Sequence, residues 1–223
     1  MTATAPRIRV WDWPVRLFHW SVAILVPLMW WTAEQGAMDW HRRLGVALLF
    51  VILFRLIWGV VGSETARFSR FLPGPSALLS YPAKLFQRPY LPSFGHNPLG
   101  ALSVVALLAA LSFQVGSGLF SVDVDGLESG PLASLVDFGT GRDIADIHET
   151  SFNILLALVA LHLAAIAVYA IALRTNLVGP MVNGNRPRVS TDPDTSAPIV
   201  APWGRVGLSA GLAAAIVWAV LSV

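Results

Sequence analysis

Residues 148–162 read HETSFNILLALVALH, an apolar stretch with a histidine at each end. The 14-residue separation corresponds to about 21 Å along an α-helix and to nearly four whole turns, so both histidines lie within roughly 40° of one face. Ionisable side chains are costly inside a membrane and are usually functional there. The stretch therefore predicts a membrane-spanning helix that presents two polar ligands at two depths.

The composition of the whole chain places it in a lipid bilayer. Of its 223 residues, 55% are hydrophobic and only 13% are charged, which is unusual for a soluble globular domain. A spanning helix needs about 20 mainly apolar residues. Five stretches reach that length, namely residues 15–33, 41–61, 98–120, 146–173 and 204–222. We therefore expect an all-α fold, a transmembrane four-helix bundle with an additional C-terminal transmembrane helix.

The same composition excludes several classes of function. The chain has no cysteine, which excludes disulfides, thiolate zinc sites, covalently attached haem and iron–sulfur clusters. A metal must then be bound by histidine or carboxylate. The net charge of +2 comes from arginines spread over several loops, so we expect no nucleic-acid partner.

Polar segments divide the chain into four expected parts. These are an N-terminal segment (1–14), the four-helix core (15–175), a flexible linker (176–203) and an accessory fifth transmembrane helix (204–223). The linker is rich in Pro, Gly, Ser and Thr and has no apolar periodicity. Helix five contains small residues that favour close helix packing, so it is a candidate surface for a complex or a homo-oligomer.

The positions of arginine and lysine predict the orientation, because short loops rich in these residues stay in the cytoplasm. Eleven of them lie in the first 16 residues, the loop 62–97 and the segments that follow residue 173, whereas the alternate loops hold only Arg42, Arg43 and Arg142. We expect a multi-pass protein of the bacterial inner membrane, with a cytoplasmic N-terminus and a periplasmic C-terminus. The N-terminus lacks the features of a cleaved signal peptide, so we expect the first apolar stretch to remain as a helix.

Four of the five histidines form two pairs when the predicted helices are threaded through the membrane. His41 and His148 lie at the outer ends of their helices, and His19 and His162 lie in the inner half. Each pair can supply the two axial nitrogens of one haem iron. A single helical histidine is often only a hydrogen-bonding or interfacial residue, and zinc or copper needs three or four ligands at one depth. Two b haems fit the two-and-two division better.

Arginines and the fifth histidine extend this hypothesis. Arg55 follows His41 by 14 residues and shares its helix face, where it either pairs with haem propionates or snorkels to lipid headgroups. Arg16 either helps to pair the inner haem propionates or is a plain positive-inside anchor. His96, just before a helix whose predicted N-cap is Asn97 and whose first residue is Pro98, is either a quinone-site residue or an interfacial anchor.

These motifs resemble one known family. RLFHW around His19, HRRLG from His41, GHNPLG around His96 and the spacing from His148 to His162 are similar to the bacterial cytochrome b561 and nickel–iron hydrogenase b-type cytochrome family, over about residues 8 to 175. The resemblance implies a four-helix core with two b haems ligated by the four paired histidines, and electron exchange with quinone. Family members serve several donors, including hydrogenase, other dehydrogenases, c-type cytochromes and, in one branch, superoxide.

Three functional hypotheses follow. The first is an electron-transfer subunit of a quinone-linked oxidoreductase, which connects a periplasmic redox protein such as a c-type cytochrome to the quinone pool; its acidic outer loop suits a basic partner. The second is a free-standing superoxide:quinone oxidoreductase, in which Arg42 and Arg43 attract the anion. The third is a haem-free transporter or scaffold, for which the sequence shows neither midplane helix breaks nor repeated halves.

Overall fold

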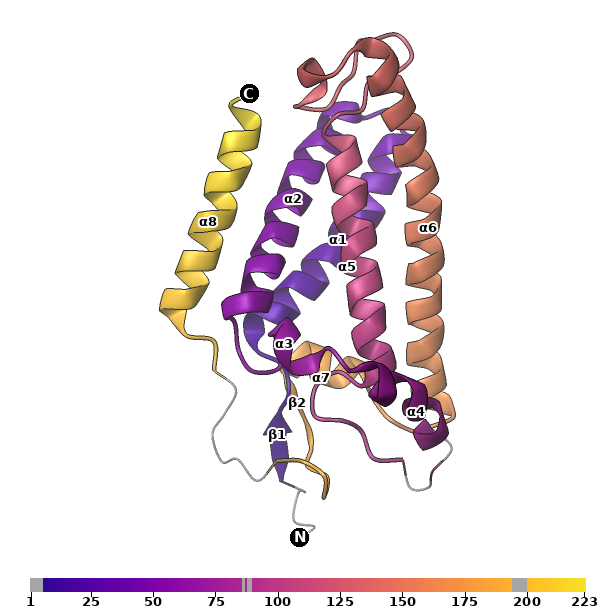
Figure 1. Ribbon diagram of the computed structural model, residues 1–223, viewed down its shortest axis with the longest axis vertical. Coiled ribbons are helices and arrows are strands. Elements are labelled where there is room, and N and C mark those ends of the chain that lie inside the picture. The colour runs from indigo at the N-terminus through magenta and orange to yellow at the C-terminus, as the bar shows by residue number, and fades with distance from the viewer. Residues whose placement is uncertain (1–5, 86, 88–89, 194–199) are drawn as a thin grey trace.

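The computed structural model describes all residues except 1–5, 86, 88–89 and 194–199. Five long helices form the body of the molecule (Figure 1): α1 (Trp13–Glu34), α2 (Met38–Val61), α5 (Pro98–Gly118), α6 (Phe138–Ile171) and α8 (Trp203–Leu221). The short elements are β1 (Arg7–Arg9), α3 (Phe68–Phe71), α4 (Pro75–Leu85), the 3-10 turn η1 (Ala133–Leu135), α7 (Val178–Asn183) and β2 (Asn185–Pro187). The predicted all-α membrane fold is confirmed.

The two ends of the bundle differ in their loops. The N-terminus, α3, α4, α7 and the β1–β2 pair lie at the end that is lower in Figure 1, and we call it the arginine-rich end. The segment between α5 and α6 and the C-terminus lie at the opposite end, which we call the acidic end because Asp123, Asp125 and Glu128 belong to that segment.

Local capping explains where three of the long helices begin. The carboxylate of Asp12 accepts a hydrogen bond from the Val15 backbone N–H at 2.8 Å, and Pro14 stands in the first turn. The side chain of Asn97 accepts from Gly100 N–H at 2.8 Å, which confirms the predicted cap of α5 before Pro98. Asp137 caps α6 in the same way. Such caps bind backbone N–H groups that the first helical turn leaves unpaired.

Among the described residues, α2, α5, α6 and α8 are long and apolar enough to span a membrane. Helix α1 is not in that group, because its four tryptophans, Arg16 and His19 lower its hydropathy. Its 22 residues nevertheless rise about 33 Å, enough to cross the hydrocarbon layer. Helix α6 has 34 residues and is longer than a single crossing requires, and it begins well before the predicted start at residue 146.

Close packing joins α1 to α2, α2 to α5, α5 to α6 and α8 to α2. A core of leucine, isoleucine and valine side chains fills the middle of the bundle between α2, α5 and α6. Leu155, which is 1% exposed, lies seven residues from both His148 and His162 on α6. This spacing is nearly two turns in each direction, so Leu155 shares their face. Its apolar side chain therefore lies between the two histidines along the helix.

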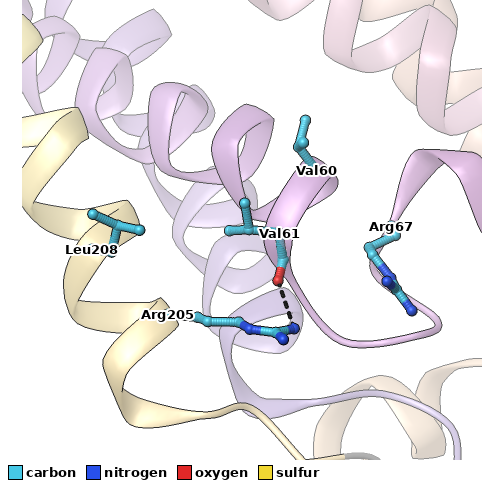
Figure 2. A pocket seen from close by; sticks show the side chains of 5 residues that line it. All are labelled: Val60, Val61, Arg67, Arg205 and Leu208. Atoms are coloured by element: carbon cyan, nitrogen blue, oxygen red, sulfur yellow. Dashed lines mark hydrogen bonds between the residues drawn. The ribbon is translucent and has the colours of Figure 1, made fainter.

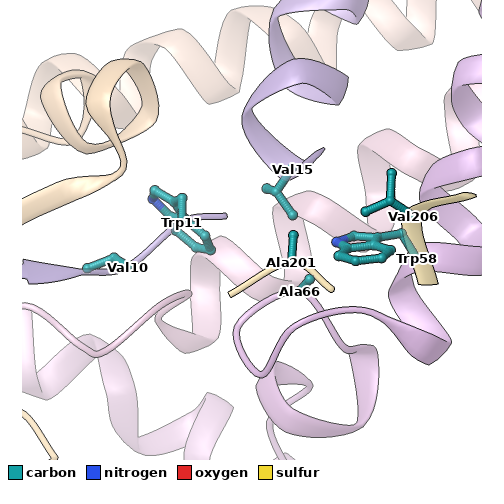
Figure 3. Close-up of a cluster of buried hydrophobic side chains, with 7 residues drawn as sticks. All are labelled: Val10, Trp11, Val15, Trp58, Ala66, Ala201 and Val206. Atoms are coloured by element: carbon teal, nitrogen blue, oxygen red, sulfur yellow. The ribbon is translucent and has the colours of Figure 1, made fainter. Parts of the chain in front are cut away.

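A second buried cluster holds the arginine-rich end together (Figure 3). Trp11 and Val15 from the start of the chain meet Trp58 of α2 and Val206 of α8, and Trp58 is completely buried. The Trp58 indole N–H donates to the buried Asp12 carboxylate at 3.0 Å. The N-terminal segment is therefore part of the folded core and anchors both α2 and the fifth helix.

The segment predicted as a flexible linker contains regular structure. Residues 178–183 form α7, and β2 pairs antiparallel with β1 so that Ile8 lies opposite Arg186. Arg186 forms a buried ion pair with Asp192. The interpretation of residues 176–193 as an irregular linker was wrong, because the pairing depends on a segment far away in the sequence. Residues 194–199 lie outside the described part of the chain.

Candidate functional site

The two histidines of each predicted pair lie opposite one another across the bundle, with their rings tilted rather than stacked. The ring centres of His41 on α2 and His148 on α6 are 6.3 Å apart, and those of His19 on α1 and His162 on α6 are 6.5 Å apart. Helix α6 thus contributes one histidine to each pair. The first pair lies toward the acidic end of the bundle and the second toward the arginine-rich end, so we call them the acidic-end pair and the arginine-end pair.

The separation within each pair is the one that two ligands on opposite sides of a metal would have. A nitrogen of imidazole lies about 2.0 Å from a bound transition metal and about 1.1 Å from the centre of its own ring. Two such rings therefore have centres about 6.2 Å apart. In the described part of the chain, no three His, Cys, Asp or Glu side chains converge as a zinc site would require. The residues present fit a metal that takes two protein ligands.

Polar contacts orient the two rings of the acidic-end pair. Nδ1 of His41 lies 2.9 Å from the backbone carbonyl of Met29, which makes Nδ1 the protonated nitrogen and leaves Nε2 free to bind a metal. Nδ1 of His148 lies 3.0 Å from the Ser117 hydroxyl, and its Nε2 lies 3.2 Å from the Gln114 amide nitrogen. For His148 to bind a metal through Nε2, the Gln114 amide has to turn aside.

Gln114, Ser117 and Ser151 form a small polar network around His148 that the sequence interpretation missed. The Gln114 amide donates to the His148 carbonyl at 3.0 Å and accepts from the Ser151 hydroxyl at 2.5 Å. Gln114 is buried near the C-terminal end of the apolar helix α5. A buried amide in a membrane span marks a functional region, and this signal was present in the sequence.

Gly118 allows the His148 ring to lie against α5. A Cβ atom at position 118 would be 2.9 Å from Cε1 and 3.3 Å from Nδ1 of that ring, closer than ordinary van der Waals contact. A Cβ atom at Gly116 would meet nothing within 4 Å. Of these two glycines near the end of α5, only Gly118 makes room for a histidine.

The arginine-end pair has an unpaired polar atom and a buried cation beside it. Nδ1 of His19 is buried and has no hydrogen-bond partner among the described residues. Arg55 is 2% exposed and does not reach the surface, contrary to the snorkelling alternative. Its guanidinium lies 4.9 Å from the ring centre of Phe68 and 5.9 Å from that of Phe18, the neighbour of His19 in the chain. Its Nη1 atom is buried, and no residue that the structure describes forms a hydrogen bond with it.

Arg16 binds a different part of the structure. Its Nη1 donates to the Val182 carbonyl of α7 at 2.6 Å, while its Nε is buried without a partner. The neighbouring Trp20 indole donates to the Met181 carbonyl at 3.1 Å. Arg16 therefore fastens α7 to the start of α1, and its Nε is a buried donor that can still bind a further acceptor.

His96 lies in an aromatic setting at the arginine-rich end. Its ring centre is 4.5 Å from those of both Trp11 and Phe71. Its Nδ1 is buried and has no hydrogen-bond partner in the described part of the chain. Burial, together with the positive charge of Arg55, lowers the pKa of His96 to about 3. The ring is therefore neutral at pH 7, and it belongs to neither histidine pair.

The arginines at the acidic end are already engaged. Arg42 forms ion pairs with Asp39 and Glu128. Arg43 lies over the Trp40 ring, with 5.4 Å between its guanidinium carbon and the ring centre. Arg142 pairs with Asp146 at 3.5 Å and donates to the Val122 carbonyl.

Comparison with known proteins agrees with this geometry. The family model described as prokaryotic cytochrome b561 matches residues 10–184. This chain belongs to that family. The cytochrome is accordingly a multi-pass protein of the inner membrane that transfers electrons with b-type haem. Helix α8 lies outside the matched range. No curated protein and no solved structure matches the chain significantly.

Proposed function

We propose that this cytochrome carries electrons across the membrane through two b haems, between a periplasmic redox protein and the quinone pool. The acidic-end pair, His41 and His148, would hold the outer haem, and the arginine-end pair, His19 and His162, would hold the inner one. The observation that carries the proposal is the ring separation of 6.3 Å and 6.5 Å, close to the spacing of two axial imidazoles.

Haem supplies the one-electron chemistry, and the protein supplies position and surroundings. The imidazoles of α6 stand 14 residues apart, so the two sites are separated by about 21 Å along the helix axis. Leu155 and the apolar core around it exclude water from the space between them. An apolar environment and fixed axial ligands are the means by which a protein sets the potential of such a centre.

Arg55 supports the inner site in this proposal. A buried guanidinium with an unpaired Nη1 needs an anionic partner. Among the described residues, the carboxylate whose charge acts on Arg55 is that of Asp12. That carboxylate is already used by Val15 N–H and the Trp58 indole. A haem propionate is the acceptor that the proposed cofactor would bring. The Nε of Arg16 is the weaker second donor.

The orientation proposed here puts the arginine-rich end in the cytoplasm and the acidic end in the periplasm, following the positive-inside rule. The acidic end has carboxylates beyond those that pair with Arg42 and Arg142. Asp125 and Asp143 are exposed there and form no ion pair among the described residues. Such a surface attracts a basic partner, for which a c-type cytochrome is a suitable class.

His96 is the proposed quinone-site residue. Its neutral ring has an unpaired nitrogen in an aromatic environment at the arginine-rich end. A neutral imidazole N–H can donate a hydrogen bond to a quinone carbonyl, and planar aromatic neighbours suit a planar ring. In a His96→Phe variant we expect the quinone KM to rise while both haems remain bound.

The superoxide alternative receives less support. It requires free cationic charge beside His41, but Arg42 is bound by two carboxylates and Arg43 lies over the Trp40 ring. An electron-transfer subunit is therefore the better-supported function.

The experiment that tests the ligand assignment is a count of haem per protein in four single alanine variants. Replacing His41 or His148 should lower the count from two to one and leave the inner haem, whereas replacing His19 or His162 should leave the outer one. Redox titration identifies which haem remains, because the two sites lie in different surroundings. His96→Ala serves as a histidine control that should keep two haems. An unchanged count in all four paired-histidine variants would refute the assignment.

A further inference from the structure

A shallow groove runs along the outside of the α2–α8 contact, near the arginine-rich end (Figure 2). It has a volume of about 360 Å³ and is lined by Val60, Val61, Arg67, Arg205 and Leu208. Neither histidine pair borders it, and α8 lies outside the matched family range. The groove is therefore separate from the proposed haem sites.

The lining has two chemically different halves. Val60 and Leu208 are aliphatic side chains that are 70% and 55% exposed, so they face the membrane from α2 and α8. Leu208 stands three residues after Arg205, which places it one turn further into the membrane on the same face of α8. Arg67 and Arg205 lie at the loop side of the groove (Figure 2). An apolar wall continuous with a cationic rim matches the shape of a lipid, whose acyl chains are apolar and whose headgroup is polar.

The two arginines have capacity left for an anion. Nε of Arg67 is buried and has no hydrogen-bond partner, and no salt bridge is formed by its side chain within the described residues. Arg205 donates one hydrogen bond, to the Val61 carbonyl at 3.2 Å, and in the same part of the chain it also lacks a carboxylate partner. A guanidinium carries five N–H donors, so most donors of both residues remain unused.

We propose that this groove binds one anionic phospholipid, with the headgroup phosphate between Arg67 and Arg205 and an acyl chain along Val60 and Leu208. Arginine suits phosphate because its planar fork offers two parallel hydrogen bonds. Basic pockets between transmembrane helices at the membrane surface are known to take such headgroups. A lipid in this position would contact α2 and α8 together and so reinforce attachment of the fifth helix.

The affinity for phosphatidylglycerol can be measured by titrating the purified, delipidated holoprotein and counting bound lipid by native mass spectrometry. One basic residue near an anionic surface contributes about fivefold in affinity, so Arg67→Gln should weaken binding about fivefold and the double variant with Arg205→Gln about thirtyfold. Arg70→Gln, an exposed arginine on α3 outside the groove, is the matched control and should change little. The affinity for zwitterionic phosphatidylethanolamine should be the same in all of these variants as in the wild type.

Two outcomes would overturn the proposal. The first is an equal loss of affinity in Arg67→Gln and Arg70→Gln, which would mean a diffuse surface effect. The second is displacement of phosphatidylglycerol by the same concentration of inorganic phosphate, which would mean a free-anion site. Because the Arg67 guanidinium forms no hydrogen bond in the described residues, Arg67→Gln should fold normally, and its result decides the matter even if the double variant is unstable.

Discussion

Replacing Gly118 by alanine should impair the outer haem site while leaving the inner one intact. The added Cβ atom would lie 2.9 Å from Cε1 of His148, and restoring an ordinary contact of 3.4 Å requires the ring to move by about 0.5 Å. Metal–ligand distances in well-formed sites vary by only about 0.2 Å. The required movement is more than twice this tolerance, and the new methyl group also approaches the Nδ1 atom that Ser117 orients.

Gly116→Ala is the matched control for this variant. Both substitutions occur near the end of α5, and both remove a helical glycine, a change worth about 1 kcal/mol in helix propensity. Only the one at position 118 meets a histidine. Helix stability therefore changes alike in the two variants, and any difference between them reports on His148.

Haem content per protein, combined with a redox titration, is the assay. We expect two haems in wild type and in Gly116→Ala, and in Gly118→Ala either one haem or a displaced potential for the outer haem alone. Two haems with wild-type potentials in Gly118→Ala would show that the His148 ring is not in this position when the cofactor is bound, and the reasoning from the ring contacts would fail.

Two further predictions concern the arginine-rich end. Arg55→Gln should lower the midpoint potential of the inner haem by roughly 50–100 mV, the size of effect expected when one nearby charge acts through an effective dielectric of 20. Arg70→Gln should leave this potential within a few millivolts, and equal shifts in both variants would contradict the role of Arg55. His96 has a pKa lowered from 6.5 to about 3. In this pH range the unfolded chain binds a proton at His96 that the folded protein does not, so the folded protein should lose stability as the pH falls from about 6.5 toward 3. His96→Phe should reduce this loss, measured as the difference in Tm between pH 7 and pH 5, and an unchanged difference would count against burial of the neutral ring.

Much of the fold follows from local rules and was therefore predictable. The ends of α2, α5 and α8 lie within three residues of the expected stretches, because apolar length and caps such as Asn97 act over a few residues. The pairing of His41 with His148 and of His19 with His162 needed only helix depth and the order of spans. The rings lie as close together as that argument required.

What sequence could not predict depends on contacts between distant segments. The β1–β2 pair joins Ile8 to Arg186, and no local pattern in either strand indicates its partner. The burial of Arg55 depends on Phe18 and Phe68 packing over it, so charge alone left snorkelling as an equal alternative. The contact of Gly118 with His148 likewise requires the exact rotation of α5 against α6.

The division of each histidine pair between α6 and the first two helices has a consequence for biogenesis. His148 follows His41 by 107 residues, and at a synthesis rate of about 5–20 residues per second the ribosome needs roughly 5–21 s to make that part of the chain. During this interval α1 and α2 supply only one histidine of each pair. In the proposed ligand assignment, haem insertion would therefore follow the synthesis of α6, the fourth long helix.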